Sequence, residues 1–117
     1  MDGDKKQLII DFINKGKVEI DSNKLKEIHK NHNNDFYEWE LKPNNTNVKI
    51  ICNISSYSIA DLTASPDNKT ITNTSIILDH EFLDDDSLLE LKLLTETRIV
   101  YMTILTENFD YFLAMLK

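Results

Sequence analysis

The chain has 117 residues, one cysteine and a net charge of −7 from 13 basic and 20 acidic side chains. This length predicts a single domain spanning residues 1–117 with a substantial core. No apolar run reaches a membrane-spanning length, the charged first residues differ from a secretory signal, and one cysteine excludes an intramolecular disulfide. We therefore expect that the protein does not contact a membrane and that it is located in a reducing cytoplasm.

The negative charge lies in the second half of the sequence. Residues 1–49 contain nine lysines and nine acids, whereas residues 50–117 contain four basic and eleven acidic residues. Arginine is the residue that most often binds phosphate and guanine through paired hydrogen bonds. It occurs once, at Arg98. The composition therefore predicts no direct nucleic-acid binding.

The first part of the chain predicts two helices. An apolar stripe at helical spacing runs through residues 8–13, Asp4 suits its cap, and Gly16 suits the position after its end. A short extended piece at residues 17–20 leads to a second, more polar helix that starts at residue 21 or 22. This opening also fits a winged-helix domain, but an electroneutral surface and the lack of arginines argue against that use.

From residue 36 the sequence alternates with the period of a strand. Residues 36–41 and 48–54 predict a hairpin, because the residues between them are rich in Pro, Asn and Thr. Residues 57–62 predict a continuation of that strand or a further one. After a turn at residues 65–68, residues 69–82 predict a long strand that is solvated on one side.

Residues 84–94 fit two interpretations. Three aspartates before an apolar run are typical of a helix start, whereas Leu89, Leu91 and Leu93 alternate with Glu90 and Lys92 as in a strand. The alternation favours the strand.

The C-terminal stretch predicts a strand followed by a helix. Residues 98–105 are rich in β-branched and aromatic side chains on both alternating sets, as in a central strand covered on both faces. Thr106 suits a helix cap, and Phe109 and Phe112 open a stripe on one helix face. We predict an α+β fold with two N-terminal helices, an antiparallel sheet of about five strands, and a C-terminal amphipathic helix packed on the sheet.

Signals for catalysis are weak, and we predict no catalytic residue, cofactor or metal. Two glycines are too few for a phosphate-binding loop or a nucleophile elbow. Cys52 lies among isoleucines, where a thiol acts as a small hydrophobe. His29 and His32 would share a helix face near Asp35, as in a two-His-one-carboxylate metal cluster, but a polar helix end is the commoner meaning of such a run.

The most informative feature is a dense group of carboxylates that we call the acidic run. It places six acids within twelve residues: Asp79, Glu81, Asp84, Asp85, Asp86 and Glu90. A calcium loop alternates its ligands and needs a glycine, so the run does not match one. Its default interpretation is a solvated turn, and the sharper one is a negative surface for a basic partner, since charge of one sign steers association.

These observations favour a non-enzymatic protein-binding module, an inhibitor or immunity-type protein. It would use the acidic run to cover a basic site on a partner protein, such as a toxin, a nuclease or a host factor, as a monomer or homodimer. One alternative is a dimeric acidic chaperone for a secreted effector. Another is a small enzyme that uses the carboxylate cluster or Cys52.

Overall fold

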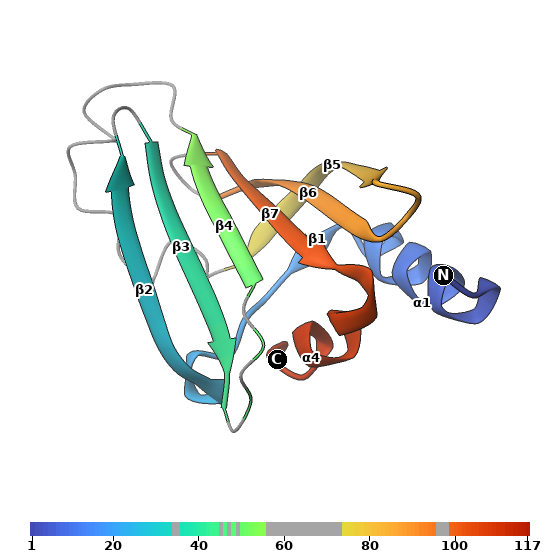
Figure 1. Ribbon diagram of the computed structural model, residues 1–117, viewed down its shortest axis with the longest axis horizontal. Helices are drawn as coiled ribbons and strands as arrows, with labels where there is room; N and C mark the ends of the chain where they lie inside the picture. Colours follow the sequence, from blue (N-terminus) through green and yellow to red (C-terminus); the bar gives the residue numbers. More distant parts are fainter. Residues whose placement is uncertain (34–35, 45, 47, 49, 56–73, 96–98) are drawn as a thin grey trace.

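A curved antiparallel sheet with helices on one side forms the fold (Figure 1). The computed structural model describes residues 1–33, 36–44, 46, 48, 50–55, 74–95 and 99–117, without the side chains of residues 22, 25–41 and 52–55. The elements, in chain order, are α1 (Gly3–Asn14), β1 (Lys17–Val18), a 3₁₀ turn (Ser22–Lys24), β2 (Leu25–Asn33), β3 (Phe36–Pro43), β4 (Ile50–Ser55), β5 (Ser75–Leu83), β6 (Leu88–Leu94), β7 (Ile99–Leu105), a second 3₁₀ turn (Thr106–Asn108) and α4 (Phe109–Leu113).

Within the described residues the sheet has seven strands in the order β1-β5-β6-β7-β4-β3-β2. All neighbouring strands are antiparallel. Strands β3 to β7 correspond to segments that the sequence predicts as strands, and β1 and β2 extend the sheet at its two edges. The predicted α+β class is therefore confirmed.

The core lies between α1, α4 and one face of the sheet, which we call the inner face. The alternate residues of β6 and β7 that point inward are fully buried: Leu89, Leu91, Leu93, Val100, Met102 and Ile104. Phe12 of α1 packs edge-on against both Phe109 and Phe112, with ring centroids 5.6 and 5.4 Å apart. Burial of these apolar side chains is the main stabilising term of the fold.

The prediction of a second N-terminal helix is wrong. Residues 22–24 form a 3₁₀ turn in which the Asp21 carboxylate accepts a hydrogen bond from the backbone N–H of Asn23, and residues 25–33 form β2, which pairs with β3. The segment offers only Leu25 and Ile28 as an apolar stripe. Pairing with a neighbouring strand therefore outweighs a weak helical pattern.

The first and last helices agree in part with the predictions. The side chain of Asp2, rather than Asp4, caps α1 by accepting a hydrogen bond from the backbone N–H of Lys5, at 2.7 Å. Gly16 has a φ of +77°, the left-handed conformation expected after a helix end. The C-terminal helix is shorter than predicted, and Leu116 instead forms a β-bridge to Ile20.

The last strand, β7, is central, as predicted, but only one of its faces is buried along the whole strand; on the other face Ile99 is buried and the following residues are more exposed. On this other face, which we call the outer face, Tyr101 and Thr103 are partly exposed and Leu105 is 44% exposed. No described element covers this outer face. The predicted strand at residues 57–62 and the turn at residues 65–68 lie outside the described residues, as does the start of the strand predicted at 69–82.

Candidate partner-binding surface

The β5–β6 hairpin carries the whole acidic run. Its register places Glu81 directly opposite Glu90, and Asp79 opposite Lys92. Asp79, Glu81 and Glu90 form what we call the outer-face group. On β7, Thr103 lies beside Glu90, and Tyr101 lies beside Lys92.

A β-bulge in β5 places the three carboxylates of the outer-face group on one face of the sheet. Ile76 pairs with Leu94 and Ile77 with Leu93, but the next pair is Asp79 with Lys92, so Leu78 is an extra residue in β5. If Leu78 were paired regularly instead of bulged, strict alternation would place Asp79 and Glu81 on the inner face. The bulge therefore brings them to the face of Glu90 and Lys92.

The outer-face group surrounds an open hollow of about 320 Å³. The residues that line it are Asp79, His80, Glu81, Glu90, Lys92 and Tyr101. Three carboxylates thus face a single lysine. Among the described residues, no ion pair within 4.0 Å joins any of these three carboxylates to a cation.

The other three acids form a tight turn at the end of the hairpin, which we call the turn group. Asp84, Asp85 and Asp86 have φ values of +51°, +52° and +65°. The backbone N–H of Ser87 donates to the carbonyl of Asp84 at 3.0 Å, which closes a turn with Asp85 and Asp86 at its centre. Positive φ at both central residues is what a type I′ hairpin turn requires.

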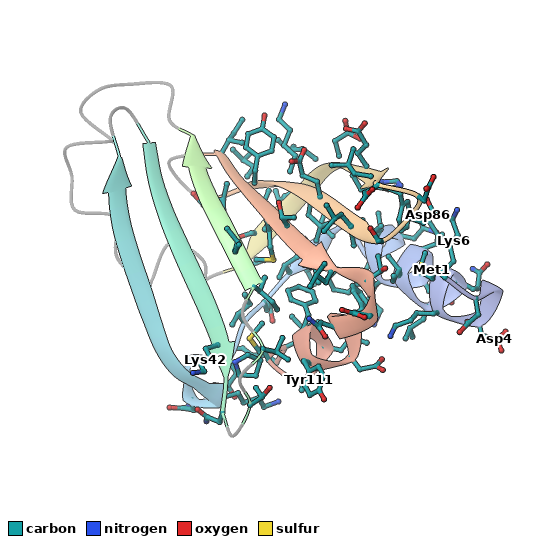
Figure 2. All side chains as sticks on the ribbon, viewed as in Figure 1. Met1, Asp4, Lys6, Lys42, Asp86 and Tyr111 are labelled. Carbon is teal, nitrogen blue, oxygen red and sulfur yellow. The ribbon has the colours of Figure 1, made fainter. Side chains whose placement is uncertain are left out.

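Asp86 anchors this turn to the rest of the molecule. Its carboxylate is 3.0 Å from the ammonium group of Lys6 on α1, and Figure 2 shows the two side chains together beside the turn. The Thr106 hydroxyl donates a hydrogen bond of 2.8 Å to the Asp86 carbonyl. Lys6 also lies 5.1 Å from the centroid of the Phe82 ring, a cation–π contact. The charge of Asp86 is thus partly compensated within the chain.

The structure therefore separates the acidic run into two groups with different roles. The outer-face group is uncompensated on an open sheet surface, whereas the turn group closes a hairpin and is held by α1. The helix start considered for residues 84–94 is not formed. The strand prediction for this segment is confirmed from Leu88 onward.

Exposed apolar side chains, which the sequence did not single out, surround the outer-face group. Ile76, Leu78, Ile51 and Leu105 are 52%, 47%, 40% and 44% exposed. Ile76, Ile51 and Leu105 pair with outer-face positions of neighbouring strands, and Leu78 is the bulge residue. A sequence signal existed, since both alternating sets of several strands are apolar. For residues 98–105 that signal predicted a core on both faces, whereas residues 69–82 were predicted to be solvated on one side.

The other candidate sites receive no geometric support. His29 and His32 lie in strand β2, so the helix face on which the suggested metal cluster depended does not exist. Asp35 and the side chain of Cys52 lie outside the described residues. Within the described part of the chain, no three His, Cys, Asp or Glu side chains are grouped to hold a metal ion.

In the described residues, no helix combines the length and the apolar character needed to cross a membrane. Comparison of the chain with protein-family models, with curated proteins and with solved structures gives no match.

Proposed function

We propose that this chain is a non-enzymatic protein-binding module, of the inhibitor or immunity type, that covers a basic site on a partner protein. The outer face of the β5–β6 hairpin would be the contact surface. The observation that carries the proposal is Glu81 directly opposite Glu90 on an exposed face, beside Asp79 and with Lys92 as the nearby cation.

Like charges directly opposite each other on a sheet destabilise the fold. In the isolated chain, the repulsion between Glu81 and Glu90 therefore destabilises the hairpin, and no ion pair among the described residues offsets it. A basic partner would reverse the sign of this interaction, because its cations would lie between the two carboxylates. This reversal supports a binding role over a purely solvating one.

The neighbouring surface is suited to a protein rather than to a small ion. Apolar side chains such as Ile76 and Leu105 lie on the same face as the carboxylates, and Tyr101 lines the hollow. Protein interfaces commonly combine apolar and aromatic contacts with charged groups that set orientation and association rate. The outer face of strands β5, β6 and β7 offers both.

The test starts from the protein that co-purifies with this chain from its native cell. Its affinity would be measured for the wild type and for the double variant Glu81→Gln/Glu90→Gln. The matched control is Asp4→Asn/Asp11→Asn on α1, which removes the same amount of charge from exposed positions that do not belong to the outer face of the hairpin.

We expect the outer-face variant to bind about tenfold or more weakly, because two charges that face the partner are lost. The control should bind within about twofold of the wild type, because its charges act only over a longer, screened distance. Equal loss in both variants would mean that only net charge matters. Full affinity in the outer-face variant would refute the proposed surface.

A further inference from the structure

Strand β5 has a backbone edge that is only partly paired. On one side it is bonded to β6 along its length, whereas on the other side β1 pairs only Lys17 with Ile76 and Val18 with Ser75. One more hydrogen bond, from the N–H of Ile77 to the carbonyl of Gly16, measures 2.9 Å. From residue 78 to residue 83, no described strand pairs with this edge (Figure 1).

The direction of the backbone groups follows from one hydrogen bond. The N–H of His80 donates to its neighbour's side chain, Asp79 Oδ1, at 2.8 Å, so it does not bond to β6. Because successive strand residues point their N–H groups to opposite sides, the N–H of Phe82 is directed to the same free edge. The edge therefore offers donors at positions 80 and 82 to an added strand.

The side chains beside this edge define what such a strand would meet. On the outer face it would lie next to Asp79 and Glu81, both exposed carboxylates. On the inner face it would lie next to His80 and Phe82, whose rings pack edge to face at 6.0 Å. Opposite charges and aromatic contacts both stabilise neighbouring strands.

The same features exclude other occupants. A second copy of the chain pairing through this edge would bring its own Asp79 and Glu81 against these carboxylates, which is repulsive. The bulge at Leu78 also hinders unspecific pairing with another strand. The hydrogen bond that the His80 N–H donates to the Asp79 carboxylate has the same effect, as is common at protected sheet edges. A strand with cations at alternate positions would compensate the carboxylates and could displace the Asp79 side chain from that N–H.

We propose that the partner adds an extended segment to the free edge of β5, with basic side chains on the outer face alternating with apolar ones on the inner face. This inference rests on the proposed function and specifies its partner. Main-chain hydrogen bonds would give affinity, and the alternating side chains would give specificity, as in other cases of strand addition.

The test uses the whole protein and a synthetic seven-residue peptide in which lysines alternate with valines. One control peptide carries N-methyl groups on alternate backbone nitrogens and has the same charge. A second control replaces every lysine with glutamate. Binding would be measured by titration, and amide hydrogen exchange would be followed residue by residue.

We expect the lysine peptide to slow exchange at His80 and Phe82, and the N-methylated peptide to bind about tenfold or more weakly because its backbone donors are blocked. The glutamate peptide should not bind. Equal binding of the lysine and N-methylated peptides, or exchange unchanged at both amides, would overturn the edge proposal. Neither result would alter the comparison of Glu81→Gln/Glu90→Gln with its control, so failure of the edge is distinguishable from failure of the acidic surface.

Discussion

At the scale of single residues, three consecutive aspartates in a left-handed conformation are the least expected feature of the chain. Residues other than glycine rarely adopt positive φ, and Asp and Asn tolerate it better than most. Asp86 is compensated by Lys6, and Asp84 accepts hydrogen bonds from Ser87. For Asp85, which is exposed, no hydrogen bond or ion pair is found among the described residues.

Replacing Asp85 with glycine should therefore raise the free energy of unfolding by about 1 kcal/mol, since glycine adopts positive φ without a steric cost. Chemical denaturation would measure the change. The variant Asp85→Asn separates conformation from charge, because asparagine removes the same charge and keeps a side chain. If Asp85→Gly gains no more stability than Asp85→Asn, backbone strain is not stored at this position.

Two buried hydroxyl groups provide a second contrast at this scale. Among the described residues, Ser75 Oγ is buried without a hydrogen-bond partner, whereas the Thr106 hydroxyl donates to the carbonyls of Asp86 and Ser87. An unsatisfied buried polar group costs free energy, and a satisfied one stabilises. Ser75→Ala should be neutral or stabilising by up to about 1 kcal/mol, and Thr106→Val should be destabilising by about 1–2 kcal/mol. Destabilisation by Ser75→Ala comparable to that of Thr106→Val would contradict this assignment.

At the scale of elements, the C-terminal segment is the main support of the inner face. Phe109 and Phe112 are fully buried and contact Phe12, so α4 joins α1 to the sheet. After α4, the N–H of Asp21 donates to the carbonyl of Met115 at 2.8 Å, and the N–H of Lys117 donates to the carbonyl of Glu19 at 3.0 Å. The last residues are thus held in place by the backbone as well as by the core.

Phe112→Ala should lower the free energy of unfolding by about 3–5 kcal/mol, because it removes a buried ring and leaves a cavity. The neighbouring Tyr111 is 46% exposed, and Tyr111→Ala should change stability by only about 0.5 kcal/mol. Truncation at Thr106 should abolish cooperative folding. A truncated chain that still melts cooperatively would show that α4 is an appendage and not part of the core.

The sequence predicts some elements better than others, for physical reasons. The pattern in β6 and β7 is strong, since apolar residues recur at every second position, and both strands agree with the prediction. The apolar pattern in β2 is weak. Its strand conformation depends on pairing with β3, which the spacing of apolar residues within β2 does not reveal. Helix caps also shift easily by a few residues, as Asp2 in place of Asp4 illustrates.

The candidate surface was predicted only as a run of residues and not as an arrangement. Proximity in sequence suggested one continuous acidic feature, whereas the structure divides it between a sheet face and a turn. The division depends on the bulge at Leu78 and on the register that places Glu81 opposite Glu90. Both are set by pairing with β6, which alternation within a single strand does not reveal.

At the scale of the whole molecule, charge is distributed unevenly over the fold. The β5–β6 hairpin carries the six carboxylates of the acidic run against Lys92, and its outer face is not covered by any described element. This concentration of negative charge attracts a basic partner. At physiological salt the attraction is screened beyond about 8–10 Å. We therefore predict that electrostatic attraction accelerates binding of the partner.

The rate of association with the co-purifying partner, measured at low and high salt, tests this central claim most directly. We expect the wild-type rate to fall several-fold to tenfold at high salt, because the attraction is screened. The double variant Glu81→Gln/Glu90→Gln, which removes two charges of the outer-face group, should associate more slowly at low salt and depend less on salt. Equal wild-type rates at both salt concentrations would contradict a role for the acidic surface in binding.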